Sequence, residues 1–180
     1  MFEPDPDNLA LVRATMCRAA LLGITVREVA VSDTRGVRCF ARDWVSGSTG
    51  GILENGVSYS EREWAVPAST LAVAAVSLDD ERAAAGAVDL IKIDVEGHEE
   101  AVIRGGIETI RRDQPILIFE CFHGASEIIN TLRPLGYVFI DAERMAADLR
   151  TTTNFLALPK RHHTALDELR RRWNDEAARA

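Results

Sequence analysis

The centre of the chain alternates apolar strands with an amphipathic helix, and this alternation constrains the fold more than any other feature. Residues 88–95 are almost continuously apolar, as a strand covered on both faces requires. Residues 97–112 carry apolar side chains at helical spacing, and residues 115–121 form a second apolar run. Strands that alternate with helices in this way indicate a parallel sheet. The sequence therefore predicts an α/β domain with helices on both faces of a sheet.

Further elements flank this centre. Asp5, with Pro6 behind it, is typical of a helix start, and Gly23 is a suitable end for that helix. We expect additional strands at 24–31, 37–40, 64–76, 137–140 and 154–158, and additional helices at 126–133, 143–149 and from 164 onwards. Residues 42–63 hold a Gly-Ser tract and show no sustained period, which favours a lid over the sheet. We predict one domain over 1–159 and a helical tail over 160–180.

Composition excludes several classes of protein. Hydrophobic residues at 47% and charged residues at 27% are typical of a globular chain. The net charge of −7 disfavours unspecific binding to nucleic acid and to an anionic membrane surface. No apolar run approaches the roughly 18 residues of a membrane span, and the first residues do not form a secretory signal. Three widely spaced cysteines form no disulfide framework, so we predict a cytoplasmic protein.

The polar residues that follow the predicted strands are the candidates for chemistry, because ligands of open parallel sheets bind at the carboxyl ends of the strands. These residues are Glu3, Ser32, Asp33, Asp94, Glu96, Glu120 and His123. Each also has a structural interpretation. Asp94 and Glu96 could cap the following helix, Glu3 and Asp33 could belong to turns, and Lys92 is expected to pair with a carboxylate.

Two histidines are candidates for a general base, since imidazole titrates near neutral pH. His98 lies in the first turn of the central helix, and His123 lies just past a strand end. A magnesium site would need hard oxygen ligands such as Asp94, Glu96 and Glu120. No fixed spacing in the sequence demands such a site, so we predict no metal.

Several segments together resemble successive landmarks of the FkbM-type methyltransferases. The most specific is residues 89–99, Asp-Leu-Ile-Lys-Ile-Asp-Val-Glu-Gly-His-Glu. Weaker landmarks occupy residues 2–6, 30–33, 78–80, 105–106, 115–120, 135–137 and 154–157. Their order and intervals agree with the family from residue 2 to about 159.

The resemblance implies a Rossmann-like class I methyltransferase sheet that binds S-adenosylmethionine and methylates an oxygen of a small molecule or a glycan. It assigns Glu3 to the ribose hydroxyls and Asp94 to the methionine end of the cofactor. Together with the strand-end argument, it makes Glu3, Ser32, Asp33, Asp94 and Glu96 the predicted cofactor-binding residues. The predicted catalytic residues are Asp94, His98 and His123.

The resemblance also implies a first strand and a Gly-rich turn ahead of residues 2–6, whereas the chain starts at Met1. We expect a chain shortened in this way to bind the cofactor weakly or not at all, and to expose a strand edge for self-association. Two alternatives stay open. One is a non-catalytic remnant that associates through this edge, and the other is a metal-dependent Rossmann-like hydrolase using Asp94, Glu96 and Glu120.

Overall fold

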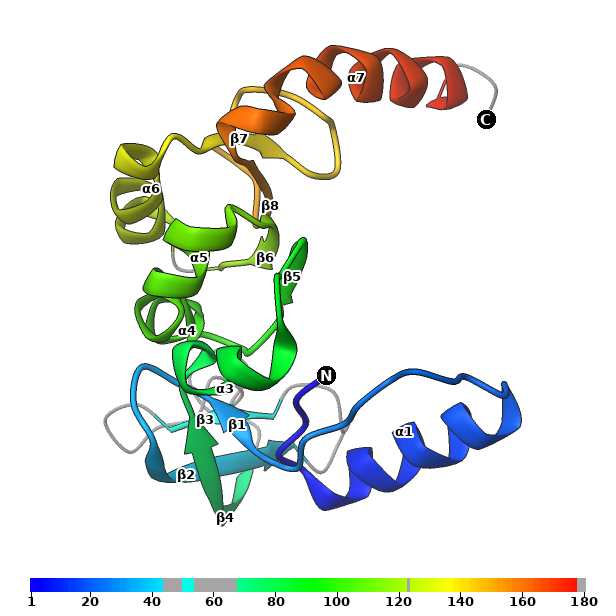
Figure 1. Cartoon of the computed structure of the whole chain (residues 1–180), viewed down its shortest axis with the longest axis vertical. Coiled ribbons are helices and arrows are strands. Elements are labelled where there is room, and N and C mark those ends of the chain that lie inside the picture. The colour runs from blue at the N-terminus through cyan, green and yellow to red at the C-terminus, as the bar shows by residue number, and fades with distance from the viewer. Residues whose placement is uncertain (44–49, 54–67, 123, 178–180) are drawn as a thin grey trace. The chain divides into compact units, whose positions relative to one another are not determined.

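The computed structural model describes residues 1–43, 50–53, 68–122 and 124–177 (Figure 1). The chain forms two compact units. Unit 1 comprises Met1–Ala84 and Val95–Gly106, and unit 2 comprises Ala85–Asp94 and Ile107–Ala180. Each unit has its own four-stranded sheet with helices, so the fold is of the mixed α/β class.

Unit 1 is built on a mixed sheet. Its elements are α1 (Pro6–Arg18), β1 (Ala30–Val31), β2 (Gly36–Asp43), β3 (Gly51–Ile52), β4 (Ala68–Val76), α3 (Leu78–Ala85) and α4 (Glu99–Gly105). The strand order is β1-β4-β2-β3, with β1 parallel to β4 and β2 antiparallel to both β4 and β3. The sheet buries Ala30, Phe40, Val73 and Ala75, against which Ile52 and Leu71 pack.

Unit 2 also contains a mixed sheet. Its elements are β5 (Leu90–Ile93), α5 (Ile107–Asp113), β6 (Ile116–Glu120), α6 (Ser126–Leu132), η1 (Arg133–Leu135), β7 (Val138–Asp141), β8 (Asn154–Leu158), η2 (Lys160–His162) and α7 (His163–Ala177). The order is β5-β6-β8-β7, and β8 runs antiparallel to both of its neighbours. The rings of Phe119 and Phe155 stack across β6 and β8 with centroids 5.0 Å apart. Helices α5 and α6 lie along one side of this sheet (Figure 1).

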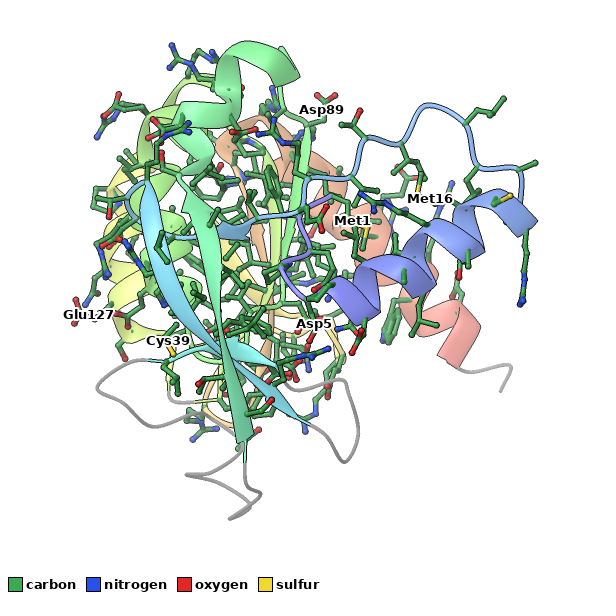
Figure 2. All side chains as sticks on the ribbon, turned by 90° about the horizontal axis from the view of Figure 1, so that it is seen from below. Met1, Asp5, Met16, Cys39, Asp89 and Glu127 are labelled. Atoms are coloured by element: carbon green, nitrogen blue, oxygen red, sulfur yellow. The ribbon has the colours of Figure 1, made fainter. Side chains whose placement is uncertain are left out.

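The predicted start of the first helix is confirmed. Asp5 is the N-cap of α1 and accepts a hydrogen bond from the backbone N–H of Asp7 at 2.8 Å. Figure 2 shows Asp5 at the first turn of this helix. The Arg42 guanidinium of β2 binds both Asp5 oxygens, at 2.7 and 2.9 Å. Burial opposes ionisation of Asp5, yet these hydrogen bonds from Arg42 and Asp7 hold its pKa below the ordinary value. The helix ends at Arg18, earlier than predicted.

The expectation of one parallel sheet is wrong. Among the described strands, only β1–β4 and β5–β6 are parallel pairs. Strands β7 and β8 run antiparallel, and the described connection between them contains no helix. Antiparallel neighbours need no helical crossover, whereas parallel neighbours do. Strand directions therefore depend on these connections, which the alternation of strands and helices alone does not specify.

Two strand predictions also need correction. Strand β5 lies at the edge of its sheet, and Leu90 is 52% exposed, so the apolar run at 88–95 is not covered on both faces. Self-association through this edge stays a prediction. The strand expected at 24–31 is reduced to Ala30–Val31, preceded by an isolated parallel bridge between Phe2 and Arg27.

Two helix predictions differ from the structure as well. The helix expected at 97–112 is split at Gly106, where the backbone leaves the helical region and a Cβ would lie 2.9 Å from Leu78 Cδ1. No helix forms at 143–149. The Asp141 carboxylate accepts the N–H groups of Glu143 and Arg144 at 2.8 and 3.0 Å, as a helix cap would. However, Met145 takes a left-handed φ of 52° and the Ala146 carbonyl accepts the N–H of Asp141 at 2.8 Å, so the segment forms turns.

Helix α3 follows β4 directly and was not predicted. Most of the predicted lid, residues 44–49 and 54–63, lies outside the described residues. Within the residues that the structure describes, no helix is both long and apolar enough to cross a bilayer.

Candidate functional site

A group of polar side chains joins the end of β1 to the start of α4. Ser32 Oγ lies 2.9 Å from His98 Nε2 and 3.1 Å from Asp33 Oδ1. Ser32 is fully buried and His98 is 6% exposed. The Thr34 hydroxyl and the Arg38 guanidinium donate to the same Asp33 oxygen at 3.2 and 3.4 Å. Three predicted site residues, Ser32, Asp33 and His98, are therefore in one hydrogen-bonded group.

Asp33 is the charged member of this group. Slight burial opposes its ionisation, but hydrogen bonds from the Ser32 and Thr34 hydroxyls, with Arg104 and Arg38 nearby, hold its pKa below the ordinary value. At neutral pH Asp33 is consequently a carboxylate that can only accept hydrogen bonds. Its side chain is 39% exposed, so it combines fixed partners inside the protein with access from outside.

Helix α4 packs closely against the same segment. The carbonyl oxygen of Ser32 occupies the space that a Cβ at Gly105 would need, and such a Cβ would also lie 2.9 Å from Asp33 Cα. Arg104 Nη2 lies 3.7 Å from Asp33 Oδ2. The sequence analysis noted Gly105 only as a landmark and missed Arg104, since no local pattern shows that the end of this helix meets the end of β1.

Glu3 forms a separate local arrangement in unit 1. Its Oε1 accepts the backbone N–H of Asp5 at 2.8 Å, and its own N–H donates to the carbonyl of Arg27 at 3.0 Å. Burial raises the pKa of Glu3, the hydrogen bond from Asp5 lowers it, and the net direction is upward. Among the described residues, no group donates to Oε2. Glu3 is thus a partly buried carboxylate with one oxygen available to a donor.

Glu96 lies in a strained loop ahead of α4. Its φ is 51°, a left-handed value that side chains other than glycine rarely adopt. Strand β3 passes close to this loop at Gly51. A Cβ at position 51 would lie 3.2 Å from Glu96 O and 3.3 Å from Glu96 Cβ, so the close contact favours glycine there. Strain of this kind concentrates at functional sites. The alternative, in which Glu96 caps the following helix, stays a prediction.

The predicted candidates of unit 2 are arranged more openly. Asp94 forms the expected ion pair with Lys92, but both side chains are exposed, at 47% and 60%, and Lys92 is not enclosed in an apolar strand. Glu120 ends β6 opposite Asn154 of β8 and is partly buried. His123 lies outside the described residues. Across the described parts of the chain, no three Asp, Glu, His or Cys side chains converge as a metal site would require, so the hydrolase alternative gains no support.

Comparisons with known proteins agree with the resemblance found in the sequence. The profile of the Methyltransferase FkbM domain matches residues 1–139. A curated relative, the 2-O-methyltransferase NoeI of Sinorhizobium fredii (strain NBRC 101917 / NGR234), is 36% identical over 122 residues. That match covers 62% of this chain and 48% of the relative, so the chain spans about half the length of NoeI.

The fold has a solved counterpart. The crystal structure of methyltransferase FkbM from Methylobacillus flagellatus KT superposes with a TM-score of 0.54 at 17% identity, over 87% of this chain and 35% of that one. At this identity the likeness concerns the fold alone. The sequence match, which extends over most of the chain, shows the family: this chain belongs to the FkbM methyltransferases.

Proposed function

We propose that the chain acts as an S-adenosylmethionine-dependent methyltransferase on a hydroxyl oxygen of a small molecule or a glycan. The family match over residues 1–139 carries this proposal. The name of the relative NoeI, a 2-O-methyltransferase, supports the choice of oxygen as the acceptor. The α/β architecture, with its resemblance to a methyltransferase structure, supports a Rossmann-like organisation. The three free cysteines are consistent with a reducing, cytoplasmic location.

The residues of unit 1 fit the nucleoside part of this cofactor. A ribose diol presents two hydroxyl donors, and Glu3 offers a partly buried carboxylate whose Oε2 has no donor among the described residues. Asp33 offers a second carboxylate that stays charged at neutral pH. Charged acceptors of this kind make stronger hydrogen bonds than neutral ones. Glu3 and Asp33 are therefore the residues that we assign to hydrogen-bond donors of the nucleoside.

We assign Asp94 to the positively charged methionine part of the cofactor. Its exposed carboxylate has only the flexible Lys92 ammonium as a described partner, so it can exchange that partner for the amino group of a ligand. When bound, the cofactor supplies a methyl group on a sulfonium. The protein has to align the acceptor with that methyl group, exclude water and remove the hydroxyl proton. His123 and His98 are the predicted bases, and Glu96 remains a predicted cofactor contact.

Calorimetric titration with S-adenosylmethionine and S-adenosylhomocysteine tests cofactor binding directly. Glu3→Ala is expected to reduce affinity by about 1–3 kcal/mol, the scale of a charge-assisted hydrogen bond. Glu28→Ala is the matched control, because Glu28 is a carboxylate of the same unit that is 57% exposed and, among the described residues, pairs only with Arg13 on the surface. Absence of binding by the wild-type chain, or equal losses in both variants, would contradict the assignment.

Transfer of a radiolabelled methyl group tests the acceptor. Glycans with a free 2-hydroxyl are compared with the same glycans blocked at that position, and small hydroxylated acceptors are tested beside them. Label in the free acceptor and none in the blocked one supports oxygen methylation at that position. Label that follows the amines or thiols of an acceptor instead of its hydroxyls would refute it.

A further inference from the structure

A continuous chain of hydrogen bonds runs from His98 through Ser32 to Asp33. The Nε2–Oγ distance is 2.9 Å and the Oγ–Oδ1 distance is 3.1 Å. Ser32 is fully buried and His98 nearly so. Buried polar groups remain stable only when they are hydrogen-bonded, so this chain fixes the geometry of all three side chains.

The donors and acceptors in this chain can be assigned. A serine hydroxyl has one hydrogen, and a carboxylate can only accept. Asp33 is held as a carboxylate, and the hydroxyl of Ser32 donates to it. Ser32 Oγ must then accept its hydrogen bond from His98, which requires a proton on Nε2. His98 therefore cannot take a proton from a substrate at this nitrogen.

The two oxygens of Asp33 have different surroundings. Oδ1 accepts hydrogen bonds from Ser32, Thr34 and Arg38. Oδ2 has one described neighbour, Arg104 Nη2, at 3.7 Å, which is longer than a hydrogen bond. Because Oδ1 is engaged by three donors, Oδ2 is the atom that can accept an N–H or O–H donor of a ligand.

Helix α4 reinforces this arrangement at both of its ends. His98 directly precedes the helix and contacts Ser32 through its ring. Gly105 is its last residue and contacts the carbonyl oxygen of Ser32 through the backbone. The segment 32–33 is thus held by a side chain at one end of the helix and by close packing at the other.

We propose that His98 and Ser32 are positioning residues, which orient Asp33 so that its Oδ2 receives a hydrogen-bond donor of the bound cofactor. This inference rests on the proposed function. It replaces two predicted roles, since Ser32 would not contact the cofactor and His98 would not act as a base through Nε2.

The first test compares two buried serines of unit 1. Ser32→Ala removes the link between His98 and Asp33, whereas Ser77→Ala removes a hydroxyl, 7% exposed as a residue, that accepts the Asp80 N–H at 3.0 Å. The free energy of unfolding and the affinity for S-adenosylhomocysteine are measured for both variants. We expect Ser32→Ala to lose about tenfold in affinity and Ser77→Ala to keep the wild-type affinity. Equal affinities in the two variants, with wild-type binding intact, would overturn the positioning role.

The second test replaces His98 and covers the case in which Ser32→Ala does not fold. The amide nitrogen of glutamine can donate where Nε2 does, so His98→Gln is expected to retain affinity, while His98→Leu is expected to lose about tenfold. A merely structural role would affect unfolding in both variants and leave the affinity of the folded protein unchanged. Loss of affinity in both variants alike would overturn the assignment of His98 as a donor.

The third test reads the pair without any cofactor. Nitrogen-15 NMR of the histidine rings reports which nitrogen carries the proton, and we expect Nε2 of His98 to be protonated in the wild-type chain but to change its signal in Ser32→Ala. An unprotonated Nε2 would overturn the inferred hydrogen-bond direction. A wild-type chain with the expected NMR signals but no affinity for the cofactor would overturn the proposed function and the role of Asp33, and would leave the His98–Ser32 link as structural.

Discussion

The two units position their polar residues in different ways. In unit 1, the candidates Ser32, Asp33 and His98 belong to one buried hydrogen-bonded group. In unit 2, Asp94 stands exposed beside a lysine, and the unit is held together by an apolar core that includes the Phe119–Phe155 stack. Candidate residues therefore follow strand ends in both units, but only in unit 1 do the described contacts hold the candidate side chains in place.

The largest effect is expected in the apolar core of unit 2. Phe119 is 1% exposed and stacks on Phe155, so Phe119→Ala should lower the free energy of unfolding by about 4 kcal/mol. Leu90→Ala, in the same sheet but 52% exposed, is the control and should change it by less than about 1 kcal/mol. Chemical denaturation measures both values. Similar losses would show that β5 is covered and that unit 2 is not built as described.

The next largest loss of stability is expected where α4 packs against the end of β1 in unit 1. A Cβ at Gly105 would overlap the Ser32 carbonyl oxygen, a backbone atom that cannot move without displacing β1. Gly105→Ala should therefore cost about 3 kcal/mol of stability. At Gly106 the nearest obstacle is the Leu78 side chain at 2.9 Å, which can move, so Gly106→Ala should cost less. Hydrogen exchange should locate the Gly105→Ala damage in unit 1, and exchange that increases equally in both units would contradict this.

The fold was predictable where the signal was local. The strands of unit 2 fall at the predicted runs, because an apolar segment bounded by turn residues is evident in the sequence itself. Strand direction was not predictable, because it depends on pairing between distant segments such as β6 and β8. The helix expected at 143–149 fails for a similar reason, since the Ala146 carbonyl accepts the N–H of Asp141 at the end of β7, and Met145 takes a left-handed φ of 52°.

The candidate site was predictable only in part. The strand-end argument singled out Ser32 and Asp33, and the predicted place of His98 in the first turn of the central helix singled out the histidine. Their contact with one another, and the contributions of Arg104 and Gly105, depend on how α4 packs against the end of β1. Side-chain packing of this kind has no signature in a single sequence. The roles of these residues towards a cofactor stay predictions.

Acid titration distinguishes the two carboxylates at the start of unit 1. Because the folded pKa of Asp5 lies below its ordinary value of 3.8, the stability that Asp5 contributes is present above that pH and is lost as the pH falls through the folded value. Asp5→Asn should therefore cost about 2 kcal/mol at pH 7, the scale of its charged hydrogen bonds, and progressively less as the pH falls through the folded pKa of Asp5. The pH dependence of stability has the opposite sign for Glu3. Because its pKa is raised, its charged form destabilises the folded state, and acidification removes that destabilisation.

Unfolding curves measured from pH 7 to pH 2 test this pair. The difference between wild type and Asp5→Asn should shrink on acidification, whereas Glu3→Gln should gain stability relative to wild type as the pH rises through the folded pKa of Glu3. A constant difference for Asp5→Asn across this range would mean that Arg42 does not stabilise the charged carboxylate.

The smallest effect on stability is expected at Asp94, and it bears most directly on the contrast between the units. An ion pair as exposed as Asp94–Lys92 contributes little, so Asp94→Asn should change the free energy of unfolding by less than about 0.5 kcal/mol. If Asp94 instead serves the proposed reaction, the same variant should reduce cofactor affinity and turnover far more than stability. Lys92→Met is the control, because it breaks the same ion pair and keeps the carboxylate. Equal effects of both variants on unfolding and on binding would leave Asp94 with a structural role. A loss of binding confined to Asp94→Asn would show that unit 2 contributes to function through Asp94, a residue that the described contacts of unit 2 do not hold in place.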